Sequence, residues 1–295
     1  FKKAFDLIDH NLLMSKLRQL DLDNRVINWL KDFLTNRYQR TKLAKDCHSE
    51  WSRVPCGVPQ GTKLGPWLFL LMINDLAVPN ANLWKYVDDT TESEIIPKGA
   101  VSNIQESVDH INNWCISNNL DLNLDKCKEL QISFSKQSCH FQPLSIGEHR
   151  LELITECKLL GMTISDDLKW YKHIDDIVSR ASKRIYFLVQ LKRAKVEVNN
   201  LIKFYKTCIR SLLEYYCAVF HDSLPDYLHL RLERIQIRCM SIIYPATTYE
   251  NALENASLSS LKQRRGKLVA KLFTNTIKDQ NHRQQFVAEQ KTILL

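Results

Sequence analysis

The chain has 295 residues, of which 44% are hydrophobic and 25% are charged. This composition is typical of a globular protein with a sizeable core, and the length allows two domains or one large one. No run of about 18 apolar residues and no signal peptide occur, so we expect no membrane span and an intracellular protein of the nucleus or cytoplasm. Because the sequence begins with Phe1 and not with Met, we also expect a fragment of a longer protein.

The net charge of +8 is concentrated in one segment. Lys169 to Arg210 contains eleven Lys and Arg against three acidic residues, which leaves the remaining chain near neutral. A basic segment of this kind suits the phosphate backbone of a nucleic acid, and a solvated helix face is the alternative. The nine cysteines include no C-x-x-C pair, so we expect reduced, packed thiols and not a zinc site.

Hydrophobic periodicity predicts short helices and strands before residue 168 and helices after it. The expected elements are helices at Asn11–Leu20, Asp23–Asn36, Leu64–Leu76, Val101–Asn118 and Leu230–Ile243, strands at Tyr38–Ala44, Glu50–Pro55 and Leu130–Phe134, a strand–turn–strand at Leu83–Glu92, and a hairpin at Leu151–Ile164. From Trp170 onward the pattern is nearly all helical.

The string Tyr86-Val87-Asp88-Asp89 places two adjacent carboxylates on a tight turn. Such carboxylates repel each other and are tolerated where solvent reaches them or a divalent cation neutralises them. A nucleotidyl transferase needs this cluster, because two Mg²⁺ ions hold the attacking 3′-hydroxyl and the leaving pyrophosphate. Taken alone, the string also fits a solvated acidic hairpin.

Further motifs lie on both sides of this string. In chain order they are FKKAFDLIDH (1–10), GVPQGTKLGP (57–66) with INDL (73–76), YVDD (86–89), LNLDKCK (122–128), LLGMTI (159–164) with LKW (168–170), and LEYY (213–216) with LERIQ (232–236). With these six motifs the chain resembles, over nearly its whole length, the reverse transcriptases of non-LTR retrotransposons, the LINE and jockey-like elements.

The resemblance implies an α+β fold. Residues 1–168 would form a polymerase palm, an antiparallel sheet with packed helices, and residues 169–295 a mostly helical thumb and C-terminal region, with the fingers largely absent. The implied activity is that of an RNA-directed DNA polymerase, which adds deoxynucleotides to a primer 3′-hydroxyl. Its partners would be an RNA template, a DNA primer and deoxynucleoside triphosphates, and its cofactor Mg²⁺, with Mn²⁺ as a substitute.

By the same resemblance, Asp88 and Asp89 are the catalytic residues that hold the metal. The family has a further metal-binding aspartate directly before the position of Phe1, and this sequence lacks it. Asp6 falls six places after that position, so we interpret it as a hydrogen-bonded structural acid. Lys126 matches the catalytic lysine that protonates the leaving pyrophosphate; Lys128 is close enough to be confused with it, and a solvated lysine is the alternative.

The resemblance also implies contacts with substrates. The expected nucleotide-binding residues are Phe5, Gln60, Gly61 and Tyr86, and Gly161 is expected to bind nucleic acid. From the charge of the basic segment, we add Lys183, Arg184, Lys192 and Arg193 as expected nucleic-acid-binding residues. The ring of Phe5 would exclude a ribose 2′-hydroxyl, and Gln60 can offer a donor and an acceptor. An ordinary core phenylalanine and a solvated glutamine are the alternatives. Trp170 and His173 would either contact nucleic acid or pack in the core.

Two expectations about the whole protein complete the hypothesis. The segment with Ala4 and Phe5 should lie beside the Asp88–Asp89 hairpin. The chain by itself should be inactive, because one metal ligand and the fingers are missing. The rival hypothesis is a decayed or domesticated remnant that binds nucleic acid without catalysis.

Overall fold

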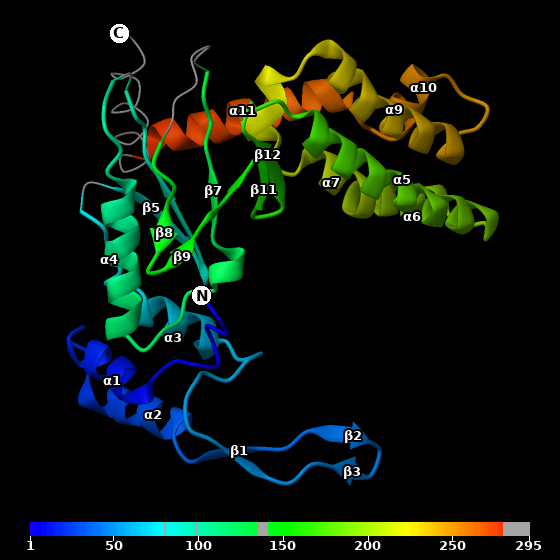
Figure 1. Cartoon of the computed structure of the whole chain (residues 1–295). Helices are drawn as coiled ribbons and strands as arrows, with labels where there is room; N and C mark the ends of the chain where they lie inside the picture. Colours follow the sequence, from blue (N-terminus) through cyan, green and yellow to red (C-terminus); the bar gives the residue numbers. More distant parts are fainter. Residues whose placement is uncertain (80, 98, 135–140, 280–295) are drawn as a thin grey trace. The chain divides into compact units, whose positions relative to one another are not determined.

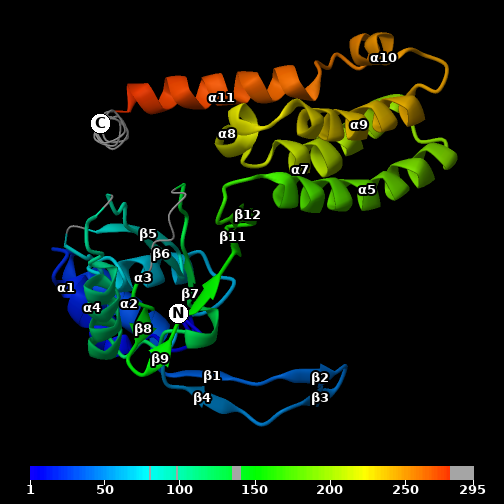
Figure 2. The same cartoon turned by 45° about the horizontal axis from the view of Figure 1, so that its top comes forward.

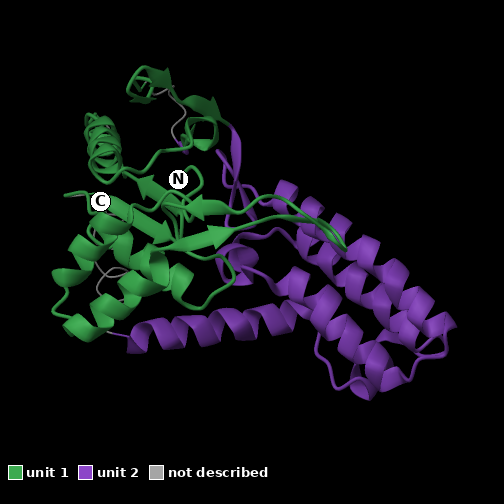
Figure 3. Ribbon diagram, turned by 90° about the horizontal axis from the view of Figure 1, so that it is seen from below, with its two compact units in different colours: residues 1–131, 135–154 green, residues 132–134, 155–295 purple. Residues whose placement is uncertain are grey.

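The computed structural model describes residues 1–79, 81–97, 99–134 and 141–279. The chain forms two compact units (Figure 3). Unit 1 is Phe1–Gln131 with Ser135–Ile154, and unit 2 is Ile132–Phe134 with Thr155–Leu295. Both combine helices with short strands, as an α+β chain should.

Four helices within the described residues form the body of unit 1 (Figure 1): α1 (His10–Arg18), α2 (Asn24–Leu34), α3 (Leu64–Met72) and α4 (Ile104–Ser117). The carboxylates of Asp9 and Asp23 accept hydrogen bonds from the first backbone N–H groups of α1 and α2, which have no partner inside the helix. Helices α1, α2 and α3 share one core, in which Leu17, Leu34 and Phe69 are fully buried.

The strands of unit 1 pair two by two in the part of the chain that is described. The pairs are β1 (Arg37–Gln39) with β4 (Ser52–Val54), β2 (Lys42–Ala44) with β3 (Cys47–His48), β5 (Asn82–Tyr86) with β6 (Asp89–Ser93), β7 (Lys128–Leu130) with β10 (Glu152–Ile154), and β8 (Ser145–Ile146) with β9 (His149–Arg150). All are antiparallel except β7 with β10, which is parallel. Figure 2 shows the β1–β4 ribbon, with β2 and β3 at its tip, extending from the helical body of this unit.

Three sequence-based expectations for unit 1 were wrong in their bounds. The strand expected at Leu130–Phe134 is β7, which ends at Leu130 where its pairing with β10 ends. The hairpin expected at Leu151–Ile164 begins only at Glu156, because the residues before it pair in parallel with β7. The helix expected from Val101 begins at Ile104, and the Val101 side chain is 84% exposed.

In its described residues, unit 2 is helical with one hairpin. In chain order it contains β11 (Glu156–Leu159), β12 (Met162–Ser165), α5 (Tyr171–Arg193), α6 (Val198–Phe204), a π-helical turn (Tyr205–Arg210), α7 (Ser211–Glu214), α8 (Cys217–Phe220), α9 (Asp226–Ile243), α10 (Tyr249–Asn255) and α11 (Leu261–Lys278). The hairpin packs on α5, and the compact unit begins at Thr155.

The core of unit 2 contains two residues for which contact with nucleic acid was an alternative. The Trp170 ring is 8% exposed and its Nε1 donates to Ser223 Oγ at 2.7 Å. His173 is fully buried, and its Nδ1 accepts from the Thr163 backbone at 3.3 Å. Both rings pack against Phe220, so packing is their role.

In the described ranges, no helix has both the length and the apolar character needed to cross a membrane. The eight cysteines in these ranges are free thiols, and Cys139 lies outside them. Burial raises the pKa of Cys115 and of Cys239 to about 12, so these thiols stay protonated at neutral pH and behave as small apolar side chains.

Candidate active site at the Asp88–Asp89 hairpin

The two adjacent carboxylates lie at the tip of the β5–β6 hairpin, as expected. Tyr86 pairs with Asp89, so Val87 and Asp88 form a two-residue turn. Val87 has φ +55°, a left-handed conformation that is unfavourable for a β-branched residue and is found where surrounding structure enforces it. The Asp89 side chain is exposed and that of Asp88 is half-buried, so both carboxylates are accessible to a cation.

The N-terminal segment joins the third motif to the residue directly before the fourth through backbone hydrogen bonds. The nitrogen of Phe1 donates to the Asp88 carbonyl oxygen at 3.3 Å. The next nitrogen, of Lys2, donates to the Asp121 carbonyl oxygen at 2.7 Å. Phe5 and Val87 pack against the same core, which confirms that this segment lies beside the hairpin.

The loop of the second motif docks directly on the first. The backbone nitrogen of Val58 donates to Phe5 O at 2.7 Å, and that of Gly57 donates to Ile8 O at 2.8 Å. Gly57 has φ +81°, and a Cβ at this position would lie 2.7 Å from the carbonyl oxygens of both Phe5 and Asp6. Only glycine fits this approach without moving the backbone.

Through this docking, the predicted nucleotide-binding residue Gln60 reaches the first motif. Gln60 Nε2 donates to Asp6 Oδ1 at 3.0 Å, a contact between residues 54 positions apart that the sequence did not predict. The bond confirms the interpretation of Asp6 as a hydrogen-bonded acid. The Phe5 ring is half-buried and stacks on Phe69, with ring centroids 5.1 Å apart. Its role as a sugar gate stays a prediction.

The C-terminal end of helix α3 is bonded to the β5–β6 hairpin through Lys85. The ammonium of Lys85, on β5, donates to the carbonyl oxygens of Ile73 and Leu76 at 2.9 Å each, at the C-terminal end of α3. A cation is favourable at the negative end of a helix. Burial lowers the pKa of Lys85, with partial compensation from Asp75. Sequence analysis missed this residue, although a lysine amid apolar strand residues next to the catalytic string was a usable signal.

The two lysines near the fourth motif differ in their contacts. Lys128 forms an ion pair with Glu152, across the β7–β10 pair. Lys126 is exposed, at the end of the short 3₁₀ turn Leu124–Lys126, and makes no ion pair or hydrogen bond to another described side chain. Lys126 is therefore the one with a side chain available to a substrate.

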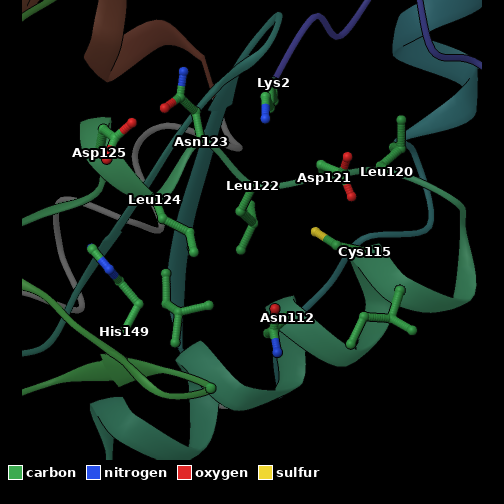
Figure 4. A pocket seen from close by; sticks show the side chains of 13 residues that line it. Lys2, Asn112, Cys115, Leu120, Asp121, Leu122, Asn123, Leu124, Asp125 and His149 are labelled. Carbon is green, nitrogen blue, oxygen red and sulfur yellow. The ribbon is translucent and has the colours of Figure 1, made fainter.

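A cleft of about 510 Å³ lies next to the fourth motif (Figure 4). Its lining includes Lys2, Cys115, Asp121, Asn123 and His149, contributed by the N-terminal segment, α4, the fourth motif and β9. The residues predicted to bind the nucleotide do not line it. The cleft is therefore distinct from the surface that carries Asp88 and Asp89.

The donor set at the hairpin fits Mg²⁺ in part. Mg²⁺ is held in proteins by one or two carboxylates, and water and substrate phosphates complete its octahedron. Asp88 and Asp89 supply two carboxylates, while one oxygen of Asp6 is already bonded to Gln60. Across the described residues, no group of three or more His, Cys, Asp or Glu side chains is arranged to hold a metal.

The hairpin of unit 2 has Gly161 at its tip. Leu159 pairs with Met162, and the turn residues Leu160 and Gly161 have φ +47° and +89°. This pattern is typical of a type I′ turn. The Tyr215 hydroxyl donates to Leu160 O at 3.1 Å, so the hairpin motif and the LEYY motif are in contact.

The four basic residues predicted to bind nucleic acid fall into two classes on α5. Lys183 and Arg193 are exposed. Arg184 is half-buried and donates to Cys208 O, and Lys192 is half-buried and donates to Ile243 O at 2.9 Å. The first pair is available to a ligand, and the second pair joins helices.

Comparisons with known proteins agree with this arrangement of motifs. The chain is 26% identical over 264 residues to the RNA-directed DNA polymerase from mobile element jockey of Drosophila funebris, which covers 84% of the chain and 28% of that relative. It is 24% identical over 253 residues to the probable RNA-directed DNA polymerase from transposon X-element of Drosophila melanogaster, which covers 82% of the chain and 27% of that relative.

The chain thus spans just over a quarter of the length of these curated relatives. Residues 1–164 match the family described as reverse transcriptase (RNA-dependent DNA polymerase). This range contains the first four motifs and nearly all of the hairpin at residues 156–165. The match extends over more than half of the chain, and it confirms the resemblance drawn from the motifs. The chain belongs to the reverse transcriptase family.

Proposed function

We propose that this chain is the polymerising part of an RNA-directed DNA polymerase, which adds deoxynucleotides to the 3′-hydroxyl of a primer on an RNA template. The observation that carries the proposal is that the first motif, through residues 1–6, contacts the second and third motifs and the residue directly before the fourth. This segment bonds to the Asp88 backbone, to the Asp121 backbone and to the loop that contains Gln60. Residues 1–168 would act as the palm and residues 169–295 as the thumb and C-terminal region.

In this proposal each residue near the hairpin has a separate task. Asp88 and Asp89 hold Mg²⁺ or Mn²⁺, which when bound polarises the triphosphate and stabilises the developing negative charge. The primer 3′-hydroxyl releases its proton to water as O3′ forms a bond to the α-phosphorus, and the bond from that phosphorus to the pyrophosphate oxygen breaks. Lys126 gives a proton to the departing pyrophosphate.

Nucleotide selection falls to the side chains that line the approach to the carboxylates. Phe5 excludes a 2′-hydroxyl, and its stacking on Phe69 supports the fixed ring position that such a gate requires. Because the Gln60 amide N–H₂ donates to Asp6, its carbonyl oxygen remains available to accept a hydrogen bond from the nucleotide sugar. Gly61, in the second motif, and Tyr86, on the hairpin, would contact the nucleotide as well.

The test is primer extension on poly-rA/oligo-dT with two proteins. The 295-residue chain, with carboxylate ligands from the third motif alone, should extend no primer with Mg²⁺ or Mn²⁺. Each missing ligand costs about 10² to 10⁴ in rate. A longer protein that adds an aspartate before Phe1 and the fingers should be active.

In the longer protein, Asp88→Asn should abolish extension. Asp32→Asn, an exposed acid on α2 of the same unit, is the matched control and should leave it unchanged. Robust synthesis by the 295-residue chain would contradict the metal-ligand argument. An inactive longer protein that still binds template and primer would instead support the rival hypothesis of a remnant that binds nucleic acid.

A further inference from the structure

The β1–β4 ribbon of unit 1 carries alternating aromatic and cationic side chains. Tyr38 pairs with Arg53 across the strands, and the Arg40 guanidinium lies 4.7 Å from the centre of the Trp51 ring. Residues opposite each other in an antiparallel pair share a face of the sheet, as do residues two apart on one strand. The four side chains therefore form a checkerboard on one face, with Tyr38 beside Arg53 and then Arg40 beside Trp51.

This face is open to solvent. Tyr38 is 62% exposed and Trp51 is 60% exposed, and both arginines of the checkerboard are exposed as well. The opposite face attaches the ribbon to the body of the unit: Arg37 is half-buried and donates to the carbonyl oxygens of Leu34 and Gly57, at 2.9 Å each. The ribbon is thus held by one face and presents the other.

The charge and the rings together identify the chemistry of a partner. From Arg37 to Val54 the chain has five Lys and Arg and two acidic residues, which gives a net charge of +3. This charge attracts phosphate groups and disfavours burial of the ribbon against an apolar protein surface. Proteins that bind single-stranded nucleic acid combine cations along the backbone with aromatic rings on which bases stack. The bases of a duplex are already stacked on each other, so exposed rings favour a single strand.

We propose that the checkerboard face binds single-stranded nucleic acid, with bases stacked on Tyr38 and Trp51 and phosphates bound by Arg40 and Arg53. The ribbon lies between the first and second motifs in sequence and contributes to neither. The choice of nucleic acid as partner rests on the proposed function, but the binding requires no catalysis.

Binding of a fluorescein-labelled 12-nucleotide oligo-rU to the 295-residue chain, followed by fluorescence anisotropy, tests the proposal. Tyr38→Ala and Trp51→Ala should each weaken binding by about 5- to 150-fold. Trp29→Ala is the matched control, because Trp29 is 56% exposed on α2 of the same unit and lies outside the ribbon and the motifs. It should bind as the unaltered chain does.

A strand of the same length that carries ribose and phosphate but no bases separates stacking from charge. The unaltered chain should prefer the strand with bases. Trp51→Ala should remove part of that preference, and the double variant with Tyr38→Ala should remove most of it. Arg53→Gln should keep the preference and reduce the slope of log affinity against log salt by about 0.7 for each lost phosphate contact. Circular dichroism of each variant should match the unaltered chain.

Three results would overturn the inference. One is that the ribbon variants lose as much affinity for a blunt duplex as they lose for oligo-rU. Another is unchanged RNA binding with a change of oligomeric state in sedimentation, which would make the face an interface between copies. The third is that all of the ribbon variants bind oligo-rU as tightly as the unaltered chain does. The proposed function would survive this result, because its test is primer extension by the longer protein. Conversely, an inactive longer protein with ribbon-dependent binding would refute only the proposed function.

Discussion

Replacing Gly57 by alanine probes the joint between the first and second motifs. Two costs arise. Gly57 has φ +81°, and a left-handed backbone costs a residue with a side chain about 1–2 kcal/mol. The new Cβ would also lie 2.7 Å from the carbonyl oxygens of Phe5 and Asp6, which belong to backbone and cannot rotate away. Overpacking of this kind costs about 1–3 kcal/mol.

The sum is about 2–5 kcal/mol, a large share of the stability of a domain. Gly61→Ala isolates the first cost, because Gly61 has a similar φ of +78° and a Cβ there meets no atom within 4 Å. The expected difference between the two variants is therefore the overpacking cost alone. For a unit of this size, it corresponds to a melting temperature lower by about 2–12 °C in Gly57→Ala than in Gly61→Ala.

Tryptophan fluorescence during thermal or urea unfolding is a suitable assay, because five of the six tryptophans lie in unit 1. Gly57→Ala should unfold first, Gly61→Ala next and the unaltered chain last. Equal transitions for the two variants would refute the close approach of the second-motif loop to residues 5 and 6. This loop would then not position Gln60 against the first motif.

Three further predictions test other parts of the structure. Burial lowers the pKa values of His173, His221 and His229. Unit 2 should therefore keep full stability above about pH 6.5, the pKa of an unfolded histidine, and lose stability as the pH falls below this value. Thermal unfolding followed by the helical circular dichroism signal between pH 8 and pH 5 measures this, and a melting temperature that does not change with pH would contradict it. Lys85→Met should destabilise unit 1 by about 1–3 kcal/mol in urea, because the carbonyl oxygens at the end of α3 lose a charged donor, whereas the exposed Lys126→Met should change stability by less than about 0.5 kcal/mol. The double variant Lys183→Glu with Arg193→Glu should reduce the salt dependence of nucleic-acid binding and leave the melting temperature unchanged. The double variant Arg184→Glu with Lys192→Glu should lower the melting temperature, because these two side chains bond to backbone carbonyl oxygens of other helices. The reverse result would mean that Arg184 and Lys192 bind nucleic acid and that Lys183 and Arg193 stabilise the fold.

Local patterns predicted the parts of the structure that local interactions determine. Helical periodicity follows Asp23, and the carboxylate of this residue caps α2. The hairpin at residues 82–93 was expected because apolar strand residues flank a tight polar turn, and its strands are five residues each. The motif order predicted which segments meet, because the family preserves their arrangement.

Long-range partners were beyond sequence analysis. The parallel pairing of β7 with β10 joins residues 24 apart and depends on what lies between them, so periodicity placed the first strand too late. The hydrogen bond from Gln60 to Asp6 needs the Gly57 approach, which no pattern in either segment encodes. The sequence analysis predicted that all four basic residues of α5 bind nucleic acid. Charge alone does not reveal which of these side chains bond to a backbone carbonyl of another helix.

The way in which the motifs are held together has a consequence for the chemistry. The contacts among them are mostly between backbone atoms, from Phe1 to Asp88, from Lys2 to Asp121 and from Val58 to Phe5. The carboxylates of Asp88 and Asp89 take no part in these contacts, and Lys85 supports the hairpin from the side of α3. Because the Asp88 carbonyl, and not its carboxylate, accepts the bond from Phe1, Asp88→Asn should leave the hairpin in place. A loss of activity in that variant then reports the charge of the carboxylate and not its position.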